Sequence, residues 1–234
     1  MARVFVLCGG KGTRLRPLTY TIPKPMLPVG KKPILEFVIR NLKRNGFSEI
    51  TLAVGYLKEQ IKAHFTDGSK WGVKIDYLEE KNELGTAGSI FAGKGSIKDP
   101  FLVVMGDHLT NANAQKLLQA HKKSGCLATI ALKKQGVPLE YGVAKITGGT
   151  VASFEEKPII ENYVNAGMYA FEPEIFNYIT DGSDFARDVF PALLKAKKKI
   201  NAFVFEDEFW MDIGRTADYE EINRIMSIME MTKE

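Results

Sequence analysis

The chain contains little cysteine and histidine, and it has no long apolar run. Cys8 and Cys126 each lie in or beside an apolar run, so neither a disulfide framework nor a zinc site is expected. The apolar run after Arg3 is too short for the ~7–15 residues of a signal-peptide core, and none approaches the ~18 residues of a membrane span. We therefore expect buried free thiols, a reducing cytoplasmic setting and no membrane partner.

Acidic residues are missing from the amino-terminal segment. Seven basic residues precede the first acid, Glu36, and several lie in the glycine-rich stretch Gly9-Gly10-Lys11-Gly12-Thr13-Arg14-Leu15-Arg16-Pro17, which follows an apolar run at residues 4–8. A buried strand that leads into glycines and clustered cations brings backbone N–H groups and positive charge to phosphates at the carboxyl end of the strand. The pattern predicts an anion site.

Overall composition predicts a globular α/β protein without a nucleic-acid partner. The chain has 234 residues, a hydrophobic content of 45% and a formal net charge of +4. This length and content suit one domain. The cations gather in one loop and at a helix end, without aromatic residues interleaved along a groove, which argues against nucleic acid.

Short apolar runs alternate with helical patterns over the first hundred residues. The predicted strands lie at residues 4–8, 50–54, 73–78 and 101–105. The predicted helices lie at residues 34–42, before Gly46, and at 57–65. The alternation predicts a Rossmann-like, mainly parallel sheet with helices on both faces.

After Asp107 the pattern changes to consecutive strands. They are predicted at residues 127–132, 143–146, 151–155 and 163–171. Helices are predicted at residues 113–123, 184–198 and 216–229. We expect a mixed sheet with a partly antiparallel second half, in a single domain over residues 1–234. No hexapeptide repeat is seen, so no carboxyl-terminal left-handed β-helix, and no acyltransferase activity, is expected.

Two common phosphate-loop patterns do not fit the glycine-rich stretch. A P-loop needs Ser or Thr after Gly10-Lys11, and a dinucleotide pattern starting at Gly10 would end on Leu15. What remains is Gly-Gly-x-Gly-Thr-Arg-Leu-Arg-Pro-Leu-Thr, followed by Pro23-Lys24-Pro25-Met26-Leu27-Pro28. This resembles the signature of the sugar-1-phosphate nucleotidyltransferases.

Further strings follow in the order typical of that family. Leu84-Gly85-Thr86-Ala87-Gly88 is similar to its nucleobase-side loop, and Gly106-Asp107 to its first metal motif. Glu156-Lys157-Pro158 resembles its sugar-phosphate motif. Asn165-Ala166-Gly167-Met168-Tyr169 resembles its sugar-hydroxyl loop, and Trp210-Met211-Asp212-Ile213-Gly214 its second metal motif. The resemblance covers residues 3 to about 220.

The resemblance implies a reaction and a set of site residues. A sugar-1-phosphate oxygen would attack the α-phosphorus of a nucleoside triphosphate, with Mg²⁺ as cofactor and pyrophosphate leaving. The implied catalytic residues are Arg14 and Lys24, and the implied metal ligands are Asp107 and Asp212. The implied nucleotide-binding residues are Leu7, Gly9, Gly10, Lys11, Gly12, Thr13, Arg14, Glu80, Gly85 and Thr86. The implied sugar-phosphate-binding residues are Gly142, Glu156, Lys157 and Asn165. Nucleotide binding would fall to residues 1 to about 110, and sugar-phosphate binding to the rest.

The residue types suit this chemistry. A phosphate monoester is largely a dianion at neutral pH, so the nucleophile needs no general base, and the site must supply positive charge instead. Arg14 offers forked donors, and Pro25 should keep Lys24 outside the helical region, which aims its side chain. Asp107 and Asp212 each end an apolar run, and carboxylate oxygens suit Mg²⁺. We read His108 as a solvated residue or as a neighbour of the metal ligands.

The substrate pair stays open. The loop at Leu84–Gly88, preceded by Glu80 and Glu83, is more similar to the mannose-1-phosphate guanylyltransferases than to the thymidylyltransferases. A carboxylate there can accept from guanine N1–H and N2, an edge that no pyrimidine presents. We expect GTP with mannose-1-phosphate, with dTTP or UTP and glucose-1-phosphate as the alternative. A catalytically silent regulatory subunit, a cytidylyl variant of the fold and a homo-oligomer are further possibilities.

Overall fold

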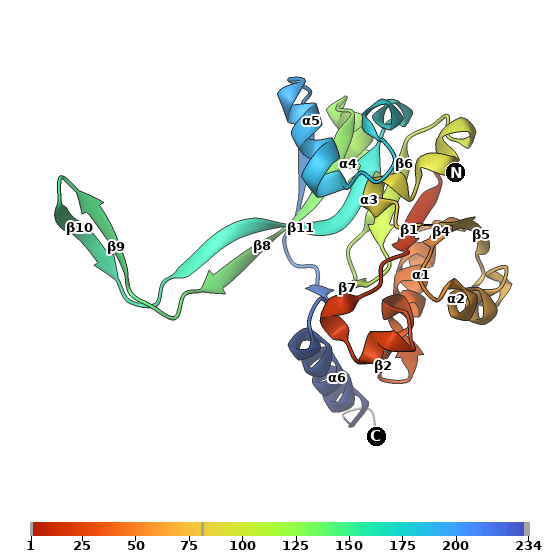
Figure 1. Ribbon diagram of the computed structural model, residues 1–234, viewed down its shortest axis with the longest axis horizontal. Helices are drawn as coiled ribbons and strands as arrows, with labels where there is room; N and C mark the ends of the chain where they lie inside the picture. Colours follow the sequence, from red (N-terminus) through yellow and green to blue (C-terminus); the bar gives the residue numbers. More distant parts are fainter. Residues whose placement is uncertain (1, 81, 232–234) are drawn as a thin grey trace.

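A seven-stranded sheet runs through the body of the molecule (Figure 1). In spatial order its strands are β12 (Ile200–Phe205), β8 (Ala128–Pro138), β11 (Ile159–Phe171), β6 (Phe101–Met105), β1 (Val4–Cys8), β4 (Glu49–Val54) and β5 (Lys74–Glu79). Neighbouring strands are parallel, except that β11 is antiparallel to both β8 and β6. The computed structural model describes residues 2–80 and 82–231.

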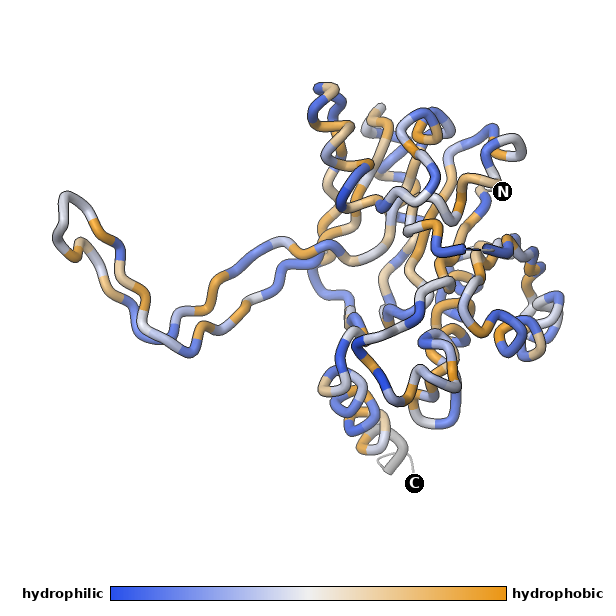
Figure 2. The backbone as a smooth tube through the Cα atoms, in the orientation of Figure 1, coloured by the Kyte–Doolittle hydropathy of each residue, from blue (hydrophilic) through white to orange (hydrophobic). Residues whose placement is uncertain are grey.

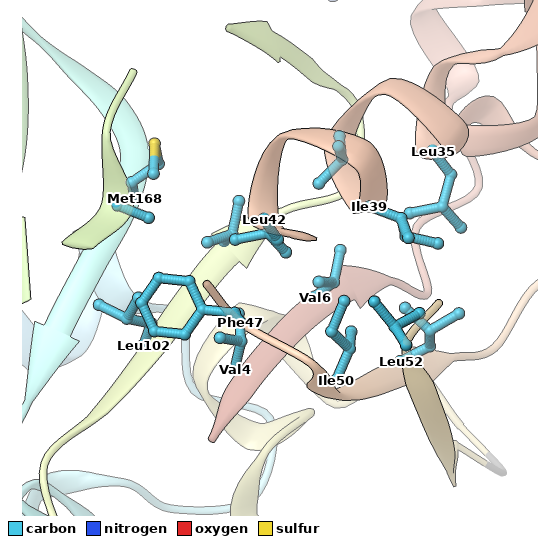
Figure 3. Close-up of a cluster of buried hydrophobic side chains, with 14 of the residues drawn as sticks. Val4, Val6, Leu35, Ile39, Leu42, Phe47, Ile50, Leu52, Leu102 and Met168 are labelled. Carbon is cyan, nitrogen blue, oxygen red and sulfur yellow. The ribbon is translucent and has the colours of Figure 1, made fainter. Parts of the chain in front are cut away.

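Both faces of the sheet are covered, as the continuous apolar runs predict. Along β1, Val4 and Val6 belong to one buried cluster and Phe5 and Leu7 to another, because successive side chains point to opposite faces. Figure 3 shows Leu42 and its neighbours on the first helix packed over Val4 and Val6. The predicted mixed, mainly parallel α/β fold is confirmed.

The helices largely follow the predicted ranges. They are α1 (Ile34–Arg44), α2 (Lys58–Phe65), α3 (Gly85–Gly88), α4 (Ala114–Ser124), α5 (Phe190–Lys195) and α6 (Thr216–Met231). None of the described helices is long and apolar enough to cross a membrane. The helix predicted at residues 184–198 is instead a π-helical turn at Phe185–Val189 followed by the short α5. Pro191 has no N–H to donate to the preceding turn, so the regular α-helix begins only at Phe190, with Pro191 in its first turn.

Several strands escaped prediction because they are short or carry polar residues. They are β2 (Pro28–Val29), β3 (Lys32–Pro33), β7 (His108–Thr110), β13 (Trp210–Asp212) and the edge strand β12. The pairing of β7 with β13 places Asp212 opposite His108. A contact between residues this far apart in sequence leaves no local pattern. It nevertheless brings the two predicted metal motifs together.

β8 and β11 extend well past the sheet, beyond their predicted ends. They continue as a two-stranded ribbon, and β9 (Val143–Thr147) and β10 (Thr150–Glu155) form a hairpin at its far end (Figure 1). We call residues 134–163 the arm. The predicted antiparallel second half is present, but much of it lies outside the body. The two cysteines are free thiols, of which Cys8 is buried and Cys126 half-buried.

Candidate active site

A cavity of about 420 Å³ opens at the carboxyl ends of β1 and β6. Its lining includes the predicted site residues Leu7, Gly9, Gly10, Gly12, Thr13, Arg14, Lys24, Glu80, Gly85, Thr86 and Asp107. Lys11 is outside this lining, and its ammonium pairs instead with the Glu83 carboxylate, at an Nζ–Oε1 distance of 2.9 Å. The roles of these residues stay predictions, but the fold brings most of the nucleotide-binding set to one place.

The glycine-rich loop is tightly packed where it approaches the cavity. Gly12 has a φ of +60°, and a Cβ there would lie 3.1 Å from the Lys24 Cβ. Its carbonyl accepts a hydrogen bond of 2.9 Å from Thr19 Oγ1. A Cβ at Gly9 would lie 2.6 Å from Glu80 Oε1. The positive φ favours glycine at Gly12, whereas a side chain at Gly9 would displace the Glu80 carboxylate.

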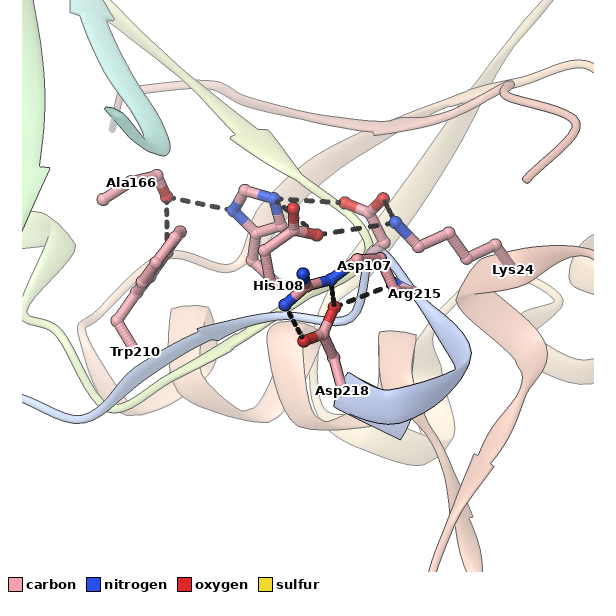
Figure 4. Close-up of polar contacts among 8 residues, drawn as sticks. Lys24, Asp107, His108, Ala166, Trp210, Arg215 and Asp218 are labelled. Atoms are coloured by element: carbon pink, nitrogen blue, oxygen red, sulfur yellow. Dashed lines mark hydrogen bonds and ion pairs between the residues drawn. The ribbon is translucent and has the colours of Figure 1, made fainter. Parts of the chain in front are cut away.

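Lys24 lies at the centre of the charged groups. It is 8% exposed, its ammonium is hydrogen-bonded to Asp107 Oδ2, and it lies 3.6 Å from Asp212 Oδ1 (Figure 4). The prediction that Pro25 excludes the helical region was wrong, because Lys24 begins a 3₁₀-helix at Lys24–Met26. In the first turn of a helix Pro25 needs no N–H partner, so the turn tolerates it.

The two predicted metal motifs meet at one point. Ligand atoms of Asp107, His108 and Asp212 all lie within 4.8 Å of one another. The Oδ1 atoms of both aspartates are buried, and neither has a hydrogen-bond partner within the described part of the chain. The nitrogens of His108 and Lys24 approach these oxygens only to 3.4–3.7 Å, so a divalent cation would satisfy both atoms better. The residues therefore fit a hard, oxygen-ligated ion such as Mg²⁺.

His108 is buried beside these carboxylates, so the reading of a solvated residue was wrong. Its Nδ1 lies 3.1 Å from the Ala166 carbonyl, which also accepts from Trp210 Nε1 at 2.9 Å (Figure 4). A carbonyl facing Nδ1 requires that nitrogen to carry its proton. Burial lowers the pKa of His108, but contacts with Asp212, Asp107 and the carbonyl outweigh burial and raise it.

Positive charge keeps Asp212 ionised. Burial raises the pKa of its carboxyl, but His108, followed by Lys24 and Arg14, outweighs burial and holds the pKa at about 2. A Cβ at Gly214 would lie 3.0 Å from Asp212 Oδ2 and 3.3 Å from Arg14 Nη1, so this glycine leaves room for both groups. The site thus holds carboxylates and cations in contact before any ligand arrives.

The loop on the other side of the cavity is anchored by a residue that the sequence analysis missed. Thr86 Oγ1 donates to Asp184 Oδ2 at 2.7 Å, and Asp184 also lines the cavity. Gly85 has a φ of +69°, and a Cβ there would overlap the Ser183 carbonyl. Asp184 lies 98 residues from Thr86 in the sequence, so no local motif marks the contact.

The predicted sugar-phosphate residues are divided between the body and the arm. Asn165, at the root of the arm, donates through Nδ2 to the Tyr169 hydroxyl at 2.9 Å. Gly142, Glu156 and Lys157 lie on the arm and are absent from the described lining of the cavity. The ladder of β8 and β11 carries them away from the body, so the structure does not bring them to the other site residues (Figure 1).

Comparisons with known proteins give relatives that match most of this chain. The chain is 36% identical to a UTP–glucose-1-phosphate uridylyltransferase of Synechocystis, with 93% of this chain and 61% of the relative covered. It is 37% identical to a probable mannose-1-phosphate guanylyltransferase of Oryza sativa, covering 93% and 62%. The chain thus spans about three fifths of the length of these relatives.

A solved structure shares the fold, and a family model shows to which family the chain belongs. HddC from Yersinia pseudotuberculosis, solved as a complex with GMP-PN, has a TM-score of 0.74 and 26% identity, covering 97% of this chain and all of that one. The nucleotidyl transferase family model matches residues 3–227. Because this match spans nearly all of the sequence, the chain belongs to the nucleotidyl transferase family.

Proposed function

We propose that this chain joins a sugar 1-phosphate to a nucleoside triphosphate and releases pyrophosphate. The observation that carries the proposal is the meeting of the glycine-rich loop, Arg14, Lys24 and two strand-end aspartates at one cavity. In this reaction a phosphate oxygen of the sugar attacks the α-phosphorus. A bond from the α-phosphorus to sugar phosphate forms, and its bond to the bridging β-phosphate oxygen breaks.

The residues supply charge and position. The incoming phosphate is already largely a dianion, so no side chain need remove a proton from it. Arg14 and the loop N–H groups bind the triphosphate, and Lys24 neutralises charge at the α-phosphate. Asp107 and Asp212 would hold Mg²⁺, whose positive charge stabilises the negative charge that develops on the phosphoryl oxygens.

A silent regulatory subunit would not need this arrangement. Such a protein needs a nucleotide pocket, but not two carboxylates packed against a buried lysine and a buried histidine. Holding these groups together without ligand costs stability, and such a cost is typical of catalytic sites. This favours the enzyme over the regulatory subunit.

We further propose GTP and mannose-1-phosphate as the substrates. Glu80 Oε1 is buried without a hydrogen-bond partner among the described residues, and the side chain borders the cavity next to Gly9. A carboxylate there accepts from guanine N1–H and N2, which uracil and thymine lack. The second candidate is UTP or dTTP with glucose-1-phosphate, which the uridylyltransferase relative supports.

A substrate matrix tests the proposal. The four common nucleoside triphosphates are combined with glucose-, mannose- and N-acetylglucosamine-1-phosphate, and pyrophosphate release is measured with Mg²⁺ present. Turnover with any pair supports the enzyme, and no turnover with all pairs contradicts it. A kcat/KM for UTP or dTTP ten times that for GTP overturns only the choice of base.

A further inference from the structure

The arm leaves the body as a curved continuation of β8 and β11, whose pairing shifts register between Asn165 and Tyr169 (Figure 1). Within the described residues, the hydrogen bonds and ion pairs of the arm join its own residues to one another. Lys134 pairs with Glu161 at an Nζ–Oε2 distance of 2.6 Å, and the Leu139 N–H donates to the Pro158 carbonyl at 3.0 Å. The body therefore holds the arm only at its root.

The hairpin at the end of the arm has one apolar face. Its register sets Val151 opposite Ile146 and Phe154 opposite Ala144, and a bulge between the two pairs keeps all four on the same side. Val151 and Phe154 are each 65% exposed, and Ile146 is 71% exposed. Figure 2 shows hydrophobic segments along the arm out to this hairpin. A two-stranded hairpin is marginally stable in water unless its apolar face packs against something.

The paired strands hold the arm away from the cavity of its own chain. Seven consecutive pairs join β8 and β11, from Ile159↔Pro138 to Asn165↔Leu132. A bend within this ladder would leave its amide groups without partners. In this structure the apolar face of the hairpin has no partner among the described residues of the body.

The joint between the ladder and the hairpin carries a preformed cluster. Gly142 and Glu156 lie together there, because a Cβ at Gly142 would be 2.6 Å from Glu156 Oε2. Lys157 has a φ of +47°, a left-handed conformation that is rare outside glycine. Strain of this kind is concentrated at functional sites. Glu156 and Lys157 are both exposed, and no residue of the arm belongs to the described lining of the cavity.

We propose that the arm is exchanged between two copies of this chain, so that Glu156 and Lys157 of each copy complete the cavity of the other. This inference rests on the proposed function. A two-fold pair with exchanged arms uses the same surfaces twice and covers both hairpins. Standard interfaces use ~20–30 residues a side, which residues 134–163 of each arm provide. Each cavity then gains Lys157 of the other copy for the phosphate of the sugar. The Lys157 of its own chain lies far from that cavity.

Complementation between two defective variants tests the exchange, at a sugar-1-phosphate concentration too low for the Lys157→Ala variant to turn over. Lys157→Ala damages only the arm, and Asp107→Asn damages only the cavity. A mixed dimer contains one intact site, made of the cavity of the Lys157→Ala copy and the arm of the Asp107→Asn copy. After unfolding and refolding together in equal amounts, random pairing should restore about a quarter of the wild-type rate. A rate no higher than the mean of the two separate variants overturns the proposal.

A matched pair controls for non-specific rescue. Lys24→Ala and Asp107→Asn both damage the cavity, so refolding them together should restore nothing in either arrangement. Recovery by this pair would overturn the interpretation. If the wild type itself has no turnover with any substrate pair, the proposed function fails, and the exchange is then decided by association alone.

Association is measured by sedimentation, without catalysis. The wild type should be a dimer, and Phe154→Lys on the apolar face should shift it toward monomer while the melting curve of the body is retained. Thr147→Lys, on the polar face of the same hairpin, is the control and should leave the dimer intact. A monomeric wild type, or equal effects of the two substitutions, overturns the proposal.

Discussion

The cavity and the arm hold their candidate residues in different ways. In the cavity, Lys24 and His108 are each at most 9% exposed and are in contact with carboxylates. On the arm, Glu156 and Lys157 are exposed, and the hairpin beside them packs on nothing in the described chain. Preorganised charges act without reorganisation, whereas exposed side chains lose conformational freedom when they bind. We therefore expect substitutions in the cavity to affect the chemical step, and substitutions on the arm to affect binding.

The largest effect is expected from the aspartates. Asp107→Asn and Asp212→Asn should each reduce turnover to near background, because a bound ion carries the largest charge in such a site. Pyrophosphate release over a range of Mg²⁺ concentrations measures this, and chelation with EDTA should have the same effect on the wild type. Asp76→Asn, on the exposed side of β5, is the matched control. A near-normal rate at saturating Mg²⁺ in either site variant contradicts the assignment.

The two lysines test the comparison directly. Lys24→Ala should lose a factor on the order of 10²–10³, mainly in kcat, because it removes a preorganised charge from the reacting phosphates. Lys157→Ala should weaken sugar-1-phosphate binding and leave triphosphate binding nearly unchanged. Calorimetric titration of each variant with each substrate separates the two roles. If triphosphate affinity fell most in the Lys157→Ala variant, the roles assigned to the two lysines would be wrong.

The sequence predicted the cavity better than the arm, for a physical reason. Val4–Cys8 and Phe101–Met105 are buried on both faces, so their apolar runs mark the strands fully, and polar residues at their ends mark the site. Residues 134–138 of β8 begin with the polar Lys134 and Gln135 and carry Gly136 and Pro138, which gives no strand pattern. Their pairing with β11 depends on a long-range ladder, so the arm was predicted only as short strands and turns.

Contacts between distant segments were also outside what the sequence could predict. The burial of His108 depends on its pairing partner in β13 and on the Ala166 carbonyl. The role of Asp184 depends on Thr86, in another part of the chain. The sequence around each of these side chains carries no motif that marks it. Each one reaches the site only because the fold brings distant segments together.

A smaller effect is expected from the base side of the cavity. Glu80→Gln should lower kcat/KM for GTP by a factor of about 10–100, because a hydrogen bond to a charged group contributes about 1.5–3 kcal/mol. Turnover with UTP should change little, since that base presents no matching donors. Glu59→Gln is the control, because its carboxylate is exposed and the residue is absent from the described lining of the cavity. Equal losses with GTP and UTP would contradict a role for Glu80 in base selection.

The smallest effect on turnover, but a clear one on stability, is expected in the body, where α4 packs against β8. His121 on α4 is fully buried, and its Nδ1 lies 2.9 Å from Thr129 Oγ1 of β8. Burial, with a further contribution from Lys122, lowers the pKa of its imidazole to about 4. The unfolded chain therefore takes up a proton below pH ~6.5 that the folded protein does not, and stability falls as the pH drops from 6.5 toward 4. Urea unfolding should give a free energy about 2 kcal/mol lower at pH 5 than at pH 7, at about 1.4 kcal/mol per pH unit. The His121→Gln variant should lose this contribution while its turnover at pH 7 stays normal. An unchanged pH dependence in that variant would show that other groups govern acid unfolding.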